Sequence, residues 1–213
     1  MKKEFDKFPE EFGGQELFGF SWLEYTAAVP SPLVVVTGYK SNGKPNATMM
    51  SWCTFTGAEG GYHCIFSSVH RSGHMYRSLK ETGCCAVNFP SADILWKCMD
   101  TIRNNGFDTD EITASGLTAE PSPRVNAPRI KECFLNMDCE PEWERDLTEE
   151  GTHAVVCLKV TGISMDERHY NNNDLGRYGE TGYLYNIRAQ RNPETGERSP
   201  MGAGVLNKIA ELS

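Results

Sequence analysis

Short apolar runs joined by tight turns are the feature that most limits what this chain can fold into. Residues 33–39 are apolar and β-branched, and residues 41–44 follow with an Asn-Gly pair that is typical of a hairpin turn. Residue types then roughly alternate over 46–55, a glycine-containing turn covers 57–61, and a third apolar run covers 62–67. The pattern predicts three consecutive antiparallel strands.

Helical spacing replaces this pattern after residue 70. We expect a short helix with Ser72 as its N-cap and Gly83 just past its end, and a second helix from Ser91 to about Asn104. Asp108, with Glu111 three residues later, resembles a capping box.

Strand-like runs return at residues 84–89, 130–139 and 153–163. A doubly wound parallel fold would need regular strand–helix alternation, which the first three strands lack. Hairpin-connected strands with short helices instead predict a mainly β fold, in which an antiparallel barrel carries helical insertions.

Composition excludes several classes of function. The 213 residues carry 21 basic and 29 acidic side chains, a formal net charge of −8, so neither nucleic acid nor an anionic membrane is an expected partner. The first 14 residues are charged and no run approaches the roughly 20 apolar residues of a membrane span, so we expect no signal peptide and a cytoplasmic protein. The eight cysteines lie in apolar runs without a Cys-x-x-Cys pair, which favours buried free thiols.

The expected organisation is an aromatic-rich N-terminal arm over residues 1–30, a barrel domain over 31–168 and a C-terminal extension over 169–213. Tyrosines in the extension indicate that it packs on the barrel or on a dimer partner.

Two segments contain candidate binding residues. Ser67, Ser68, Arg71 and Ser72 follow a strand and precede a helix, where hydroxyls, a guanidinium and the helix dipole favour an anion such as phosphate. The simpler alternative is that Ser72 only caps the helix and that Arg71 is a surface residue.

The second segment lies in the strand expected over residues 46–55. Asn46, Thr48 and Ser51 interrupt its apolar residues and need polar partners if they are buried. They suit the rim of a polar ring, or else they face solvent. His70 and His74 lack a third ligand nearby, so no metal site is expected.

Several motifs together resemble the flavin reductase-like family, which includes the flavoredoxins. They are Gly-Lys-Pro-Asn at 43–46 leading into Thr-x-x-Ser-Trp at 48–52, Ala-Val-Asn-Phe-Pro at 86–90, Ala-Ser-Gly-Leu-Thr at 114–118 and Ile-Lys-Glu-Cys at 130–133. The similarity extends over roughly residues 28–165.

The resemblance implies a split β-barrel homodimer with FMN near the subunit interface. The residues it assigns to the isoalloxazine and ribityl chain are Asn46, Ala47, Thr48, Met49, Met50, Ser51 and Trp52. It assigns the phosphate to Ser67, Ser68, Arg71 and Ser72, places Asn88 nearby and names no catalytic residue. Gly73 and Met75 depart from the family, in which many members have Arg and Thr at the helix entry.

The implied activity is an oxidoreductase that takes electrons from NAD(P)H to FMN and on to an acceptor. The alternative is a flavoredoxin-type FMN electron carrier with a protein redox partner and little NAD(P)H turnover. A flavin-free binding module is a third possibility.

Overall fold

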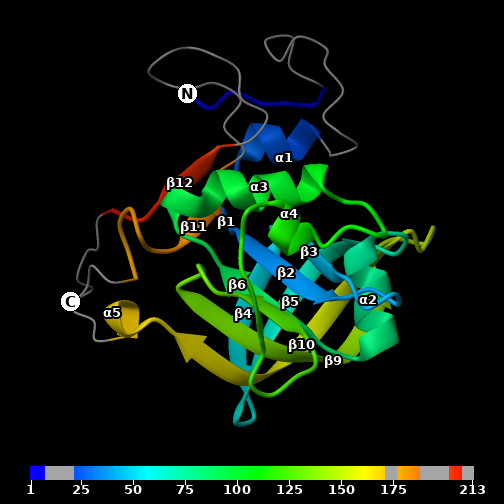
Figure 1. The fold of residues 1–213 in the computed structure, drawn as a ribbon. Helices are drawn as coiled ribbons and strands as arrows, with labels where there is room; N and C mark the ends of the chain where they lie inside the picture. The colour runs from blue at the N-terminus through cyan, green and yellow to red at the C-terminus, as the bar shows by residue number, and fades with distance from the viewer. Residues whose placement is uncertain (8–21, 171–176, 188–201, 208–213) are drawn as a thin grey trace.

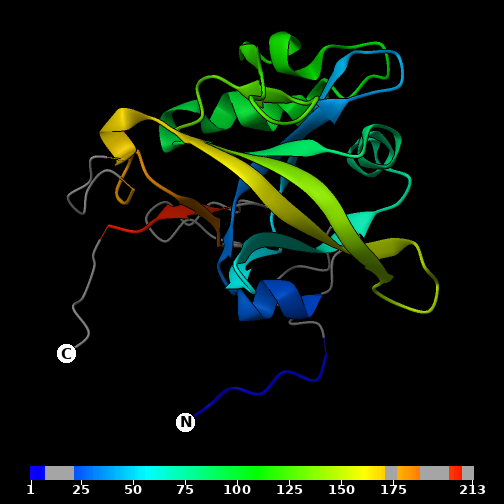
Figure 2. The ribbon, with the colours of Figure 1, turned by 90° about the horizontal axis from the view of Figure 1, so that it is seen from below.

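The computed structural model describes residues 1–7, 22–170, 177–187 and 202–207. Its main feature is a seven-stranded sheet, in which each neighbouring pair of strands is antiparallel, in the order β3-β2-β6-β9-β10-β5-β4. The strands are β2 (Val34–Tyr39), β3 (Pro45–Met50), β4 (Cys53–Ala58), β5 (Gly61–His70), β6 (Cys85–Phe89), β9 (Leu135–Asp146) and β10 (His153–Met165). The sheet curls into a split barrel (Figures 1 and 2), which confirms the predicted fold class.

The two edge strands of this sheet, β3 and β4, follow each other directly in the chain. Only Ser51 and Trp52 separate them, and within the described residues β3 and β4 do not pair with each other. The sequence predicted one strand over 46–55, which is wrong because Trp52 adopts φ 54° and turns the backbone. This two-residue corner therefore connects the two open edges of the barrel along the chain.

Two apolar layers hold the barrel. The interior packs Val34, Phe66, Leu135 and Leu158 together with Met75 of α2 (His74–Thr82). The second layer lies outside the sheet, between β2 and β3 and the helices α3 (Leu95–Arg103) and α4 (Glu111–Ala114), which Figure 1 shows above the barrel. The strand β3 is thus covered on both faces.

The helix predictions are confirmed in part. Gly83 is the C-cap of α2 with φ 70°, as expected, but the N-cap is Gly73 rather than Ser72. Ser91 precedes a short 3-10 helix, η2 (Ala92–Ile94), that leads into α3, and its side chain makes no capping hydrogen bond. The N-cap of α4 is Asp110, because its carboxylate accepts from Ile112 N and Thr113 N, so the capping box predicted from Asp108 is wrong.

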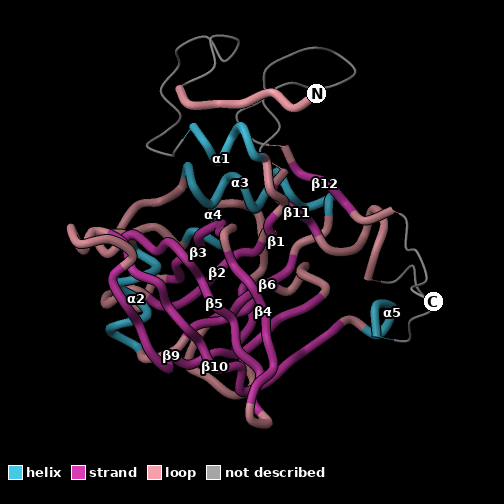
Figure 3. The backbone as a smooth tube through the Cα atoms, turned by 180° about the vertical axis from the view of Figure 1, so that it is seen from behind, coloured by secondary structure: helices cyan, strands magenta, loops and turns pink. Residues whose placement is uncertain are grey.

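Two smaller sheets complete the fold. The hairpin of β7 (Ala119–Pro121) and β8 (Pro128–Ile130) precedes β9, so the single strand predicted over 130–139 is interrupted. The strands β1 (Ser31–Pro32), β11 (Leu184–Asn186) and β12 (Ala203–Val205) form the other sheet. The described part of the C-terminal extension thus pairs with the segment that enters the barrel, as Figure 3 shows from behind; α5 (Glu167–Tyr170) precedes it.

The remaining helix, α1 (Trp22–Ala27), lies at the end of the molecule where the first described residues run (Figure 1). The arm predicted over 1–30 lies outside the described residues at 8–21, and the three domain boundaries stay predictions. All eight cysteines are buried and free, as predicted.

Candidate functional site

The corner between β3 and β4 joins several of the predicted site residues. The carbonyl oxygen of Trp52 accepts hydrogen bonds from Ser67 N and Ser67 Oγ, both at 2.9 Å. Ser51 Oγ accepts from Asn186 Nδ2 of β11 at 3.2 Å. A positive φ is strained in a residue as large as tryptophan, and such strain often marks a functional site.

A cavity of about 540 Å³ opens at this corner. Its walls come from α1 and the following linker on one side, and from Trp52, Thr54, Ile65 and Ser67 on the other. The lining is mostly apolar, which suits a flat ring system. Cys53 also lines the cavity, but burial raises the pKa of its thiol to about 12, so it is no nucleophile at neutral pH.

The residues of β3 divide between its two faces because side chains alternate along a strand. Ala47 and Met49 pack outward against the layer under α3 and α4, whereas Met50 packs against the barrel interior. Asn46 and Thr48 share the inward face with Met50. The predicted run 46–52 therefore cannot present all its side chains to one ligand.

Asn46 carries an unusual buried atom on this inward face. The residue is 1% exposed, and its Oδ1 has no hydrogen-bond partner among the described residues, while its Nδ2 lies 3.4 Å from Thr48 Oγ1. The strand partner of Asn46 is Gly38, where an added Cβ would lie 3.4 Å from Ser78 Cβ, and Ser78 Oγ also lacks a partner in this part of the structure. Leaving such groups unpaired costs about 1–3 kcal/mol each.

Arg71, the predicted phosphate contact, is engaged by protein groups. Its guanidinium donates to Glu144 Oε1 at 3.0 Å and to Asp146 Oδ1 at 2.6 Å, and it contacts the Tyr76 hydroxyl. Burial pushes the pKa of Glu144 up, but the hydrogen bonds from Arg71 and Tyr76 outweigh it, so the pKa is lowered. The phosphate contact of Arg71 stays a prediction, and it competes with this ion pair.

The other residues of the predicted phosphate cradle lie in β5 and in the turn that leads into α2. Ser72 Oγ lies 2.7 Å from His70 Nδ1, and Ser68 lies one residue beyond Ser67 at the end of β5. A Cβ at Gly73 would lie 3.2 Å from His70 O, which explains why a glycine is present there. Met75 is buried in the barrel core, so it offers no donor to this site.

Asn88 does not lie free in a binding site. It is fully buried on β6, where Nδ2 donates to Val35 O at 2.8 Å and Oδ1 accepts from Ile130 N and from Asn136 Nδ2, both at 2.9 Å. Its amide group is thus used in joining strands. Its predicted place near the ligand stays a prediction.

Sequence reasoning missed a buried ion pair beside β3. Glu111 of α4 is fully buried, and its Oε1 accepts from Lys40 Nζ at 2.9 Å while its Oε2 accepts from Ala47 N at 2.8 Å. Oε1 also lies 3.4 Å from Nδ1 of His74, the first residue of α2. Lys40 Nζ donates in addition to the carbonyls of Gly106 and Thr109.

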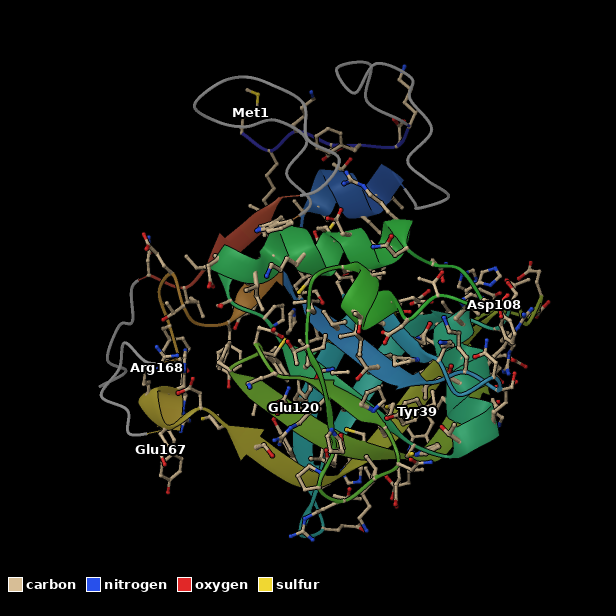
Figure 4. The ribbon with its side chains drawn as sticks, viewed as in Figure 1. Met1, Tyr39, Asp108, Glu120, Glu167 and Arg168 are labelled. Atoms are coloured by element: carbon tan, nitrogen blue, oxygen red, sulfur yellow. The ribbon has the colours of Figure 1, made fainter. Side chains whose placement is uncertain are left out.

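Figure 4 marks this region by Tyr39 and Asp108, which lie on the flank of the molecule where α2 is. No pattern in the sequence announced the pair, because a lysine beside a turn normally points to solvent.

A second cavity, of about 790 Å³, lies away from the predicted site residues. Figure 4 labels three of its lining residues, Glu120, Glu167 and Arg168. Its charges are largely paired, since Arg129 contacts Glu120 at 3.2 Å and Arg168 contacts Asp166 at 2.9 Å. Among the described residues no cluster of three or more potential metal ligands occurs, and none of their helices combines the length and apolar character of a membrane span.

Comparison with known families shows one match over most of the chain. Residues 26–191 match the family described as "Flavin reductase like domain". An uncharacterized protein of Methanothermobacter thermautotrophicus is 29% identical over 98 residues, which are 46% of this chain and 46% of that protein. That alignment thus spans about half the length of the relative.

Three solved structures are similar in fold. A split-barrel protein from Shewanella frigidimarina, described as a flavin reductase, has a TM-score of 0.74 at 16% identity, over 97% of this chain and 98% of that one. Nitrilotriacetate monooxygenase component B from Bacillus cereus has 0.73 at 18%, over 100% of both chains. Flavoredoxin of Desulfovibrio vulgaris has 0.68 at 16%, over 100% of this chain and 97% of that one. At such identities the likeness shows the fold alone.

Proposed function

Because this chain belongs to the flavin reductase-like domain family, we propose that it is an FMN-dependent oxidoreductase that passes electrons from NAD(P)H to an acceptor. The fold and the family support binding of a flavin. FMN in particular, NAD(P)H as the electron donor, a homodimer and a cytoplasmic location are parts of the proposal. Once bound, the flavin would supply the hydride and electron transfer.

The observation that carries the proposal is the unpaired acceptor of Asn46. A buried oxygen without a donor is costly to fold, so a site that keeps one suits a ligand that brings the donor. A flavin has such donors in its ring imide and in its ribityl hydroxyls. Thr48 lies beside Asn46 on the same face of β3 and would join it in orienting the ligand.

The remaining contacts follow from the two segments already described. Trp52 and Ser67 line the apolar cavity at the corner, which would exclude water from one side of the ring. The first turn of α2 offers backbone N–H groups and a positive dipole end to the phosphate. Arg71 and Lys80 add little net positive charge there, because Glu144 and Asp146 contact them.

A titration of the purified protein with FMN tests the proposal. We expect one equivalent of FMN per chain, bound without a covalent link, and bleaching of the flavin absorbance when NAD(P)H is added without oxygen. Failure to bind FMN after reconstitution would refute the proposal and leave a flavin-free binding module.

A flavoredoxin-type electron carrier is the second candidate. It is favoured by the likeness to the Desulfovibrio vulgaris flavoredoxin and by the net charge of −8, which suits docking to a basic redox protein. A carrier would bind FMN tightly but would be reduced by a partner protein, not by NAD(P)H alone. The same anaerobic bleaching experiment therefore separates the two functions.

A further inference from the structure

The carboxylate of Glu111 joins two segments that are far apart in the sequence. One oxygen holds the backbone of β3 through Ala47 N, and the other lies next to His74, with which α2 begins. These two segments contain the residues proposed for the ring side and the phosphate side of the flavin. Glu111 itself comes from a third element, α4, and does not line the corner cavity.

The contact with Ala47 occurs at the outer edge of the barrel. Ala47 pairs with Thr37 of β2, but its N–H is directed to Glu111, so it points to the side of β3 that has no neighbouring strand. An edge strand is otherwise fixed along one side only. The carboxylate supplies the missing partner at the residue next to Asn46.

The ion pair with Lys40 makes this arrangement possible. Both side chains are buried, with 3% and 0% of their side-chain surfaces exposed, and the ammonium has three oxygen partners. Buried ion pairs contribute little net stability compared with apolar residues of the same shape. The Lys40–Glu111 pair instead fixes a carboxylate oxygen beside the N–H group of Ala47.

We propose that Glu111 is a positioning residue that sets β3 and the first turn of α2 in the relative arrangement that binds FMN. The inference rests on the proposed function and deepens it. Glu111 acts through Ala47 and His74 and does not touch the flavin.

Two double variants separate the hydrogen bond from the charge. Lys40→Met with Glu111→Gln removes both charges but keeps a side-chain oxygen for Ala47 N. Lys40→Met with Glu111→Leu removes the charges and the oxygen. We expect the glutamine variant to bind FMN within about threefold of the unaltered protein, and the leucine variant to bind at least about tenfold more weakly, the change expected for one lost buried hydrogen bond.

Hydrogen exchange of the flavin-free proteins provides a second readout. Amides of the segment 45–50 should exchange faster in the leucine variant only, at a temperature at which both variants are folded. Equal FMN affinities, or equal exchange over this segment, would overturn the inference. If the unaltered protein binds no FMN, the proposed function fails, and the exchange contrast still decides whether Glu111 anchors β3.

A third variant covers the case in which the leucine protein does not fold. His74→Ala leaves Lys40, Glu111 and Ala47 in place and changes a side chain that is 20% exposed. We expect FMN to bind about three- to tenfold more weakly, on the scale of one hydrogen bond, with the exchange of 45–50 unchanged. Unchanged FMN affinity would refute the role of Glu111 at α2.

Discussion

At the residue scale, two asparagines on neighbouring parts of the sheet show how burial can serve different ends. Asn88 and Asn46 are both essentially buried, but the amide of Asn88 is satisfied by residues of three strands, β2, β8 and β9, whereas Asn46 Oδ1 has no partner in the described structure. The sequence predicted both as ligand contacts. It could not separate them, because the difference depends on which backbone groups the fold brings near each amide.

Replacing each asparagine by leucine tests this difference. Asn46→Leu should leave the free energy of unfolding unchanged or raise it, because an unpaired buried acceptor disappears, yet it should weaken FMN binding about two- to tenfold. Asn88→Leu is the matched control and should cost about 3 kcal/mol or more, because several buried partners lose their bonds. Urea unfolding and FMN titration measure both. A large loss of stability in Asn46→Leu would show that Asn46 is structural.

Arg71 gives a prediction with a defined pH dependence. The pKa of Glu144 in the folded protein lies below its ordinary value of 4.5, so Glu144 contributes stability above that pH and loses it as the pH falls through the folded pKa. Arg71→Ala should therefore lower the free energy of unfolding more at pH 7 than at a pH below the folded pKa of Glu144, where the carboxyl group is protonated and the ion pair is lost. Unfolding curves at the two pH values provide the measurement.

The same variant tests the phosphate contact. Because Glu144 and Asp146 already neutralise the guanidinium, we expect FMN and riboflavin to lose affinity to the same small extent. A loss confined to FMN would assign Arg71 to the phosphate.

At the scale of the elements, the regular parts were predictable and the interruptions were not. Alternation and the Asn-Gly turn identified β2, β3 and β5, and Gly83 marked the end of α2. The break at Trp52 was missed because tryptophan carries no signal for a left-handed backbone, which glycine or asparagine would have given. The site itself was predicted only as two segments, since the link through Glu111 exists only in three dimensions.

The start of α4 is a second such case, and it can be tested. Asp110→Ala should lower the free energy of unfolding by about 1 kcal/mol, because Ile112 N and Thr113 N lose their acceptor. Asp108→Ala, the control, removes only an exposed contact with Asn42 at 3.2 Å and should change stability by less than half as much. Equal losses of stability in the two variants would show that Asp108 also caps the helix, as the sequence predicted.

At the scale of the whole molecule, the corner cavity is lined by residues of α1 and β1, and β1 pairs with β11 of the C-terminal extension. If two chains complete the flavin site as proposed, binding and association must be linked. The apparent FMN affinity should then fall as the protein is diluted into monomers. Sedimentation across a concentration series, followed by flavin absorbance, tests this, and a monomer that keeps its FMN would contradict the homodimer.

The outer edge of β3 also matters for solubility. An open strand edge offers unpaired N–H and C=O groups to any passing chain and so favours aggregation. In this protein the Glu111 carboxylate accepts a hydrogen bond from one of those N–H groups, that of Ala47. The helices α3 and α4 also cover the outer face of β3. Glu111 thus places a charged acceptor where another strand would otherwise add, and the barrel can stay open at this edge without recruiting its neighbours into fibres.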